Sequence, residues 1–526
     1  MDGSPVQGSD GDPNLTNCDS SAPVRYFDGT VSMSTTDLTS DGFGTSWGQT
    51  RSWSNTAGYA GVALPTYGSQ PLTYNGNGWV DTQLPFLETD NVFNTVIVIL
   101  DGTNALFFDH VDTNPTPRFF TQDKLLATGG EFLLTDTAGD QIHFYGFHGQ
   151  PGSSRFGRFE SMTDTNGNTT VVTSWTSDGK PTEIVRSTPP EQEPSATESW
   201  LYSYVSSGVN QGLLANVTLR RLGADGNWTI VRQVDYSYYN TGETHGNPND
   251  LKTATVRDAT GNALDTSYYR YYLDSRGFDG LQYVFNAQSY ARLAASVGDP
   301  FTATDQQVAP YADNYYEYDS SRRVTKEVAQ GTSCSCADTG GQGTYSFSYF
   351  SASQGSDYNT WQYRTIETLP DNSPTFVSRN IVYSNGYGEV MLKVYESGAP
   401  GSTQKWETFY QYDQAGRITL QANPSAVTGY DESKPDLLNN VSGHYQYLQD
   451  SQGEIDLTDY YAATTATATT PGGVAGFLQD TKLQQGQLGT PILQTSTQYY
   501  LHAGGKVDVK VVTPGGTSDS SPATQF

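Results

Sequence analysis

One serine motif in the sequence has the residue types of a hydrolytic site. Gly44-Thr45-Ser46-Trp47-Gly48 matches the G-x-S-x-G pattern in which a nucleophilic serine lies on a sharp turn between a strand and a helix. Glycine and tryptophan residues flank the motif here, and no helical pattern follows it. We therefore interpret this match as a coincidence.

The histidines do not form a catalytic or metal-binding pattern. His143 and His148 are five residues apart on expected strands, so their side chains point to opposite faces. Neither belongs to a zinc-protease motif. We predict no catalytic or metal role for these two or for the others, which are His110, His245, His444 and His502.

Carboxylates are abundant, with 56 Asp and Glu against 28 Lys and Arg. A pair of carboxyl groups about 5–10 Å apart can hydrolyse a glycosidic bond, but the sequence fixes no such distance. Exposed tryptophans among the acids would support binding or cleavage of carbohydrate, which we keep as an alternative function. The candidate acids are Asp109, Asp112 and Asp136, and the candidate tryptophans are Trp47, Trp79 and Trp361.

The three cysteines are too few for a disulfide scaffold. Cys334 and Cys336 are too close for an easy disulfide, and no histidine near them completes a zinc set. A loop without a catalytic role, a bridge from one of the pair to Cys18, and metal or redox chemistry all stay open. Asp10-Gly11-Asp12-Pro13-Asn14 begins like a calcium loop, but the required glycine and glutamate are absent. We predict no cofactor and no bound metal.

The charge and hydropathy of the chain exclude some classes of partner. A net charge of −28 repels phosphate backbones, so we predict no nucleic acid partner. No apolar run reaches the roughly 18 residues of a transmembrane helix. No signal peptide follows Met1. Acidic, cysteine-poor chains rich in Thr, Ser and Asn are common among secreted microbial surface proteins. We therefore expect an extracellular or cell-surface bacterial protein, in mature form or as a fragment.

The elements that position these residues are predicted to be β-strands joined by tight turns. Tyr410 and Tyr412 are two apart, so both rings lie on one face of an extended strand. Asp413 can accept hydrogen bonds from turn amides, and Gly416 can adopt the positive φ of a tight turn. Arg417 then begins a second alternating run, so the stretch predicts a strand, a turn and a strand.

The same hairpin pattern recurs along the chain. Tyr316, Tyr318, Asp319 and Arg323 repeat it, but Arg322 stands at the glycine position, which leaves the geometry of that turn in question. Looser copies contain Asp164 with Gly167, Asp178 with Gly179, Asp258 with Gly261, Asn385 with Gly386, and Asp450 with Gly453.

These patterns divide the chain into four predicted parts. Residues 1–22 read as an irregular leader, 23–156 as an N-terminal β segment, 157–512 as the repeat segment and 513–526 as a polar tail. The only good helix candidate is 286–297. With 35% hydrophobic, 13% aromatic and 16% charged residues, we expect a sheet with partly wet faces that tyrosine suits, without a large aliphatic core.

The ordered set of motifs resembles the Rhs/YD-repeat family. The stretch from Tyr410 to Thr419 matches the family repeat almost position for position, and that from Tyr316 to Thr325 departs mainly at the glycine. Residues 23–55, 133–144 and 157–168 are similar to the family's N-terminal lead-in.

The resemblance implies an all-β fold: a long antiparallel sheet of hairpin repeats that spirals into a partial hollow shell, with at most one or two short helices. Relatives such as toxin-complex cocoons, Rhs toxins and teneurins use the shell to enclose a protein or to present a surface at cell contact. We therefore expect a non-enzymatic shell protein without catalytic residues, with an encapsulated or cell-surface protein partner.

Toxin members of the family end in a segment with an Asp-Pro-x-Gly motif, which does not occur before Phe526. Self-cleavage and a toxin payload are therefore not transferred to this chain. A third alternative is a self-assembling subunit of a filament or surface layer, joined through exposed edge strands.

Overall fold

The structure is a computed structural model. It describes residues 19–20, 24–31, 33–55, 74–90, 94–109, 115–147, 154–191, 195–273, 280–329, 343–352, 355, 357–502 and 506–512. Several residues considered above lie outside the described residues: Asp10–Asn14, Cys18, His110, Asp112, His148, Cys334 and Cys336.

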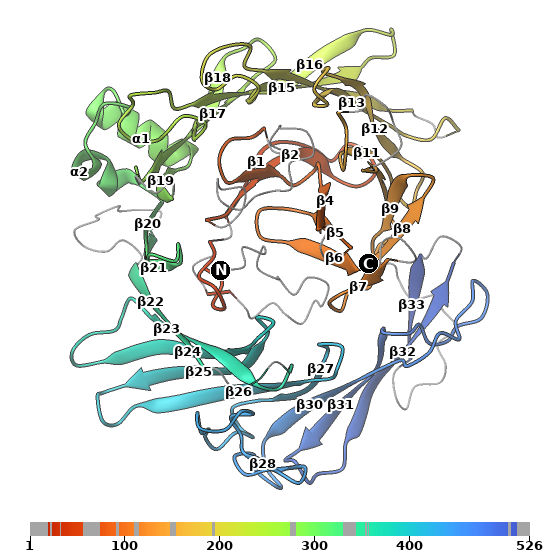
Figure 1. The fold of residues 1–526 in the computed structure, drawn as a ribbon, viewed down its shortest axis with the longest axis vertical. Helices are drawn as coiled ribbons and strands as arrows, with labels where there is room; N and C mark the ends of the chain where they lie inside the picture. The colour runs from red at the N-terminus through yellow and green to blue at the C-terminus, as the bar shows by residue number, and fades with distance from the viewer. Residues whose placement is uncertain are drawn as a thin grey trace.

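In the described part of the chain, 24 strands pair in one antiparallel sheet that closes on itself (Figure 1). We name this sheet the wall. Most neighbouring strands also follow one another in the sequence, and the ring is completed where the last strand lies beside β8. The wall strands are β8 (Lys124–Thr128), β9 (Glu131–Thr135), β10 (Gln141–Tyr145), β11 (Phe159–Thr163), β12 (Thr169–Trp175), β13 (Pro181–Ser187), β14 (Thr197–Tyr204), β15 (Leu214–Leu222), β16 (Trp228–Tyr238), β17 (Leu251–Arg257), β18 (Ala263–Tyr271), β19 (Leu281–Phe285), β20 (Asn314–Tyr318), β21 (Val324–Ala329), β22 (Gly343–Ser351), β23 (Trp361–Thr368), β24 (Val377–Asn385), β25 (Val390–Gly398), β26 (Gln404–Tyr412), β27 (Ile418–Ala422), β30 (Glu454–Tyr460), β31 (Leu478–Gln485), β32 (Ile492–Leu501) and β33 (Val507–Val512).

The number of strands makes the wall too wide to fill with its own side chains. Strands lie about 4.8 Å apart, so the ring has a circumference of at least roughly 115 Å. About eight strands already give an interior that side chains just fill. A wall of this size therefore encloses space that its own side chains do not fill, and that space holds either water or other polypeptide.

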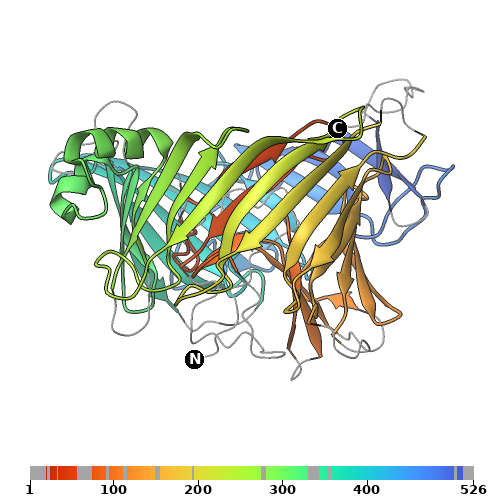
Figure 2. The same cartoon turned by 90° about the horizontal axis from the view of Figure 1, so that it is seen from above.

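The described N-terminal residues lie inside the ring, as the red ribbons of Figures 1 and 2 and the innermost orange strands of Figure 1 show; the outer orange strands belong to the wall. We name the described residues between Val24 and Asp123 the internal segment. It forms a three-stranded and a four-stranded antiparallel sheet. Its strands are β1 (Met33–Ser40), β2 (Trp47–Trp53), β3 (Trp79–Asp81), β4 (Phe86–Asp90), β5 (Thr95–Ile99), β6 (Ala105–Asp109) and β7 (Thr116–Pro117).

The internal segment and the wall share a buried core. Side chains alternate along a strand, so Trp47, Gln49, Arg51 and Trp53 lie on one face of β2, and all four are buried. Trp47 and Trp53 belong to the same apolar cluster as wall residues on β14 to β20. The wall side of that cluster includes Trp200, Tyr202, Val217, Tyr236, Tyr238, Tyr269, Tyr271 and Tyr316.

The described α-helices are short and lie outside the wall. The predicted helix at 286–297 is confirmed as α1 (Ala287–Val297), with Asn286 as its N-cap residue. It is followed by α2 (Asp305–Val308), which begins with a capping box of Thr304 and Gln307, and by a 3-10 helix, η2 (Ala309–Tyr311). A short hairpin of β28 (Asn440–Val441) and β29 (His444–Tyr445) completes the described elements.

The predicted fold class, an all-β antiparallel shell with one or two short helices, is confirmed. Strands β8 to β10 lie in the same sheet as the strands after residue 157, while the predicted domain boundaries stay a prediction. No helix among the described residues is long and apolar enough to cross a membrane.

Candidate functional site

The turn at Asp413–Arg417 shows why the repeat has its residue pattern. The amide of Asp413 donates to the carbonyl of Arg417 at 2.9 Å, and Gly416, with φ of 83°, donates to the carbonyl of Asp413. Asp413 Oδ1 accepts from the amides of Ala415 and Arg417, and Oδ2 accepts from Arg417 Nε at 2.7 Å. A short carboxylate therefore satisfies the amides of the turn and also pairs with the Arg417 side chain. Tyr410 and Tyr412 precede it on β26.

The turn at Asp319–Arg323 has the same geometry although it lacks the glycine. Arg322 has φ of 67° and donates its amide to the carbonyl of Asp319. Asp319 pairs with Arg323 as Asp413 pairs with Arg417. Tyr316 and Tyr318 lie on β20, so the departure at Arg322 changes the local strain and leaves the hairpin intact.

The other predicted repeat residues also lie at turns of this kind. Asp164 and Gly167 belong to the turn between β11 and β12, where the Gly167 amide donates to the Asp164 carbonyl. Asp178 and Gly179 belong to the turn between β12 and β13, and Asp178 pairs with Lys180 Nζ at 2.8 Å. These residues are distributed along the wall, one turn after another, and do not converge on one site.

Three of the repeat turns contact the internal segment. They follow β20, β24 and β26, which run in the same direction, so the turns lie at one rim of the wall. Asn55 Nδ2 donates to the carbonyl of Arg322 at 2.6 Å. A Cβ at Gly388 would lie 3.1 Å from the ring of Phe27. The guanidinium of Arg417 lies 5.3 Å from the ring of Phe120. The repeat turns therefore hold the internal segment as well as closing hairpins.

A buried ion pair anchors the internal segment at mid-wall. Arg51 donates to both oxygens of Asp37, at 2.6 and 2.8 Å, and Tyr236 of the wall donates to Asp37 Oδ2 at 2.6 Å. The guanidinium also lies 4.7 Å from the ring of Trp79. Because the Arg51 side chain is 1% exposed, its charge depends on Asp37 for compensation.

A second cluster, centred on the buried Glu198, joins β1 to three wall strands. Ser40 Oγ donates to Glu198, and Arg186 and Arg221 bind the same carboxylate at 3.1 and 2.9 Å. Arg186 also donates to the carbonyl of Thr45 at 2.7 Å. This cluster fixes the β1–β2 hairpin to β13, β14 and β15.

Three buried carboxyl groups have pKa values far above the usual range. Burial raises the pKa of Asp81, Glu88 and Glu327 to about 7 in each case. Asp81 and Glu88 lie on the internal segment, and Glu327 lies on β21 of the wall. No local pattern in the sequence marks these three residues, because their burial comes from contacts between the internal segment and distant wall strands.

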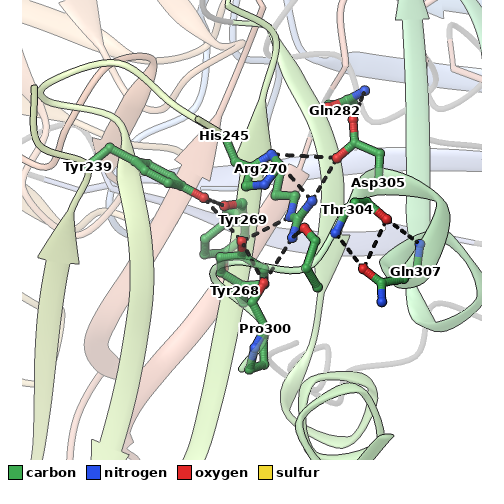
Figure 3. Close-up of polar contacts among 11 residues, drawn as sticks. Tyr239, His245, Tyr268, Tyr269, Arg270, Gln282, Pro300, Thr304, Asp305 and Gln307 are labelled. Carbon is green, nitrogen blue, oxygen red and sulfur yellow. Dashed lines mark hydrogen bonds and ion pairs between the residues drawn. The ribbon is translucent and has the colours of Figure 1, made fainter. Parts of the chain in front are cut away.

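A polar cluster on the outer face attaches the helices to β18 (Figure 3). Arg270 is fully buried and donates to Tyr268 Oη, to Asp305 Oδ1 at 2.7 Å, and to the carbonyls of Pro300 and Ala303. Because these donors are occupied by the protein itself, the cluster is a structural attachment for the segment that carries α1 and α2.

The motifs weighed for catalysis do not form a site in the described residues. Ser46 donates to Asp41 and is followed directly by β2, which is the reason the G-x-S-x-G match has no elbow geometry. Asp109 is paired with Arg118, and Asp136 opens a tight turn. In the described ranges no group of three or more His, Cys, Asp and Glu residues could hold a metal ion.

The expectation of exposed tryptophans is wrong for the three residues considered. Trp47, Trp79 and Trp361 are 3%, 0% and 6% exposed. Trp47 and Trp79 pack between the internal segment and the wall, and Trp361 belongs to a second buried cluster around β24 to β27. Aromatic runs that look like a binding surface in the sequence are here the core of a closed sheet.

Comparisons with known proteins give structural similarity without a family assignment. No family model matches the chain, and no curated protein matches it. The chain is similar to the crystal structure of TcdB2-TccC3, with 12% identity, a TM-score of 0.31, and coverage of 93% of this chain and 27% of that chain. The structure of TcdB2-TccC3-Cdc42 matches with 11% identity, a TM-score of 0.17, and coverage of 77% and 27%. A porin-like protein from Bacteroides uniformis matches with 8% identity, a TM-score of 0.14, and coverage of 62% and 91%.

The chain thus spans 27% of the length of the TcdB2-TccC3 chain that it matches. Because every one of these TM-scores is below 0.5, we base the fold on the strand pairing of this chain itself.

Proposed function

We propose that this chain is a non-enzymatic shell protein of the Rhs/YD-repeat type, which works outside the cell or at its surface by enclosing polypeptide. The observation that supports the proposal is the internal segment, which lies within a closed wall of 24 strands in the described residues. The enclosed polypeptide is in this case part of the same chain.

The contacts between wall and internal segment are specific. The Arg51–Asp37 pair and the hydrogen bonds to Glu198 are directional and shared between the two parts, and Arg51, Asp37, Arg186 and Glu198 are buried. Groups of this kind fix one arrangement, because a misplaced internal segment would leave charges buried without partners. If the internal segment were held by apolar contacts alone, these buried ion pairs and hydrogen bonds would not be needed.

A nicking experiment tests enclosure. A protease site is inserted at Gly129, in the turn between β8 and β9, where no atom lies within 4 Å of the position of an added Cβ. After cleavage we expect the N-terminal piece to co-migrate with the rest of the chain in native gel filtration and to separate only in denaturant. The piece released at Gly129 carries the internal segment and β8. A matched site at Gly261, another open turn, also cuts between two wall strands but leaves the internal segment covalently joined to β8 to β17. Separation of the Gly129-nicked pieces under native conditions would contradict enclosure.

Location and partners need separate experiments on the source cells. We expect antibodies against the folded protein to label intact cells or the culture medium. Chemical cross-linking on intact cells should join the chain to an enclosed or cell-surface protein. Labelling only after cell lysis would contradict the extracellular proposal.

Carbohydrate binding stays a second candidate because of one aromatic pair. Tyr395 and Trp406 are cross-strand partners on β25 and β26, stack at 5.5 Å, and are 37% and 42% exposed. A glycan array with wild type and Trp406→Ala tests this function, and no binding by wild type would remove it.

The closed wall leaves no free edge among its described strands, so we do not propose a filament joined by wall edges.

A further inference from the structure

Two buried glutamates face the interior of the wall from the two strands that flank β22. Glu327 on β21 lies opposite Tyr345 of β22, and Glu367 on β23 lies opposite Phe347 of β22. Cross-strand partners share a face, and Tyr345 and Phe347 are two residues apart, so both glutamates are on the same face. Both are 0% exposed.

One of these glutamates holds the start of the internal segment. Tyr26 Oη donates to Glu367 Oε2 at 2.6 Å, and Asn380 Nδ2 of β24 donates to the same oxygen at 2.8 Å. Thr365 Oγ1, two residues before Glu367, donates to the carbonyl of Tyr26. Tyr26 is 2% exposed, so wall and internal segment are joined here by buried hydrogen bonds between residues more than 300 positions apart.

The two glutamates have fewer hydrogen-bond donors and counter-charges around them than two buried carboxylates would require. Glu327 Oε1 accepts from Asn314 Nδ2 at 2.8 Å, but Glu327 Oε2 and Glu367 Oε1 accept no hydrogen bond. No Lys or Arg in the described part of the chain forms an ion pair with either glutamate. Lys393 of β25 lies nearby, with its Nζ 5.6 Å from the Tyr26 ring. The other titratable or charged groups around the two glutamates and Tyr26 are Asp19, Asp28 of the internal segment, Tyr316 and Tyr318 of β20, Arg323, and Tyr345 and Tyr349 of β22.

We propose that the buried carboxyl group of Glu327 is a proton-binding site, and that its proton keeps the internal segment attached where Tyr26 binds Glu367 on the same face of the wall. When Glu327 loses its proton, a negative charge without a counter-ion is buried on the face of the wall that binds Tyr26, and the wall around Tyr26 loosens. This inference goes beyond enclosure, because it names the group that controls attachment of the enclosed part. It does not depend on any partner.

The direction of the pH response follows from burial. Burial is the largest cause and raises the pKa of Glu327 to about 7; the hydrogen bond from Asn314 lowers this pKa, and Glu367 makes a smaller contribution that raises it. A carboxyl group with a raised pKa in the folded state favours the attached form at low pH, and this contribution is lost as pH rises through the folded pKa. The attachment of Tyr26 should therefore weaken between about pH 6 and pH 8.

Hydrogen exchange measured by mass spectrometry on the full chain tests the proposal. After correction for intrinsic exchange rates, we expect the protection of residues 24–31 in wild type to fall about tenfold from pH 6 to pH 8. Glu327→Gln removes the charge and keeps the shape, so its protection should change little with pH. Glu317→Gln, on the same hairpin but partly exposed and paired with Lys326, is the matched control and should behave as wild type.

Two further measurements keep the proposal falsifiable if Glu327→Gln folds poorly. The infrared band of a buried protonated carboxyl group should be present in wild type at pH 6 and decrease by pH 8. Tyr26→Phe, which cannot donate to Glu367, should leave residues 24–31 weakly protected at both pH values. Protection of these residues that is independent of pH in wild type, or equal pH dependence in wild type and Glu327→Gln, would overturn the proposal.

Discussion

At the scale of single residues, the repeat depends on one backbone position. The fourth residue of the repeat turns has positive φ, and glycine reaches that conformation without strain. Arg322 reaches it too, at φ of 67°, which costs about 1 kcal/mol or more for a residue with a Cβ. The wall tolerates this strain at one turn because the Asp319 hydrogen bonds remain the same as those of Asp413.

Glycine in these turns should matter most where the turn touches a neighbour. A Cβ at Gly416 would lie 2.7 Å from the Tyr358 ring and 2.8 Å from Glu389, whereas one at Gly261 meets nothing within 4 Å. Both residues have positive φ. We expect Gly261→Ala to lower the free energy of unfolding by about 1 kcal/mol and Gly416→Ala by about 2–4 kcal/mol. Equal decreases in the free energy of unfolding of the two variants, measured by thermal or urea unfolding, would contradict the steric argument.

The buried Arg51–Asp37 pair gives a second prediction at this scale. Asp37→Asn leaves the guanidinium buried without a counter-charge, and we expect it to lower stability by about 3–5 kcal/mol. It should also make the internal segment sensitive to protease. Lys326→Met, which breaks the partly exposed pair with Glu317, is the control and should change stability by less than about 1 kcal/mol. Similar losses of stability in both variants would show that burial of an ion pair does not determine how much stability is lost when the pair is broken.

At the scale of elements, hairpins were predictable because their signals are local. Tyrosine spacing, Asp at the start of a turn and Gly at its end lie within about ten residues, and α1 had helical spacing beside a polar start. The four-residue α2 was missed, since one helical turn has too few residues to show a period. The sequence also could not show that Arg270 and Asp305 meet, because 35 residues separate them.

The attachment of the helices should depend on Arg270. Arg270→Met keeps the apolar volume but removes the guanidinium hydrogen bonds to Asp305, Pro300 and Ala303. We expect faster hydrogen exchange in 287–311 with little change in β20 to β27. Arg292→Met, on the exposed face of α1, is the matched control. Unchanged exchange in 287–311 of the Arg270 variant would show that apolar packing alone holds the helices.

At the scale of the whole molecule, the unexpected feature is the filled interior. The sequence predicted a curved sheet, and the strand pairing confirms it. It did not predict that the N-terminal strands lie within the ring, because nothing local distinguishes Trp53 packed against the wall from a tryptophan on a surface. The raised pKa values of the buried acids could not be predicted for the same reason. Nothing next to Asp81 in the sequence marks it as buried, and its burial arises only in the folded chain.

Stability of the whole chain should fall as pH rises from about 5 to about 8. Asp81, Glu88 and Glu327 have folded pKa values of about 7, above their unfolded values near 4, so the folded state binds more protons in this window. Each unit of difference corresponds to about 1.4 kcal/mol at most for a group that is fully coupled to folding. The loss is complete above pH 8.

The measurement is the melting temperature across that pH range in constant ionic strength. Asp81→Asn should reduce the slope, because the amide has no proton to lose. A melting temperature that rises from pH 5 to pH 8 would contradict the predicted direction.

The position of the internal segment also has a consequence for biosynthesis. A ribosome releases residues 24–123 before any strand of the ring exists, and the seam between β33 and β8 can form only after residue 512 has been made. The contents are therefore present first and are wrapped afterwards. Assembly in this order needs no entrance, and a chain that stalls before β33 leaves its contents uncovered.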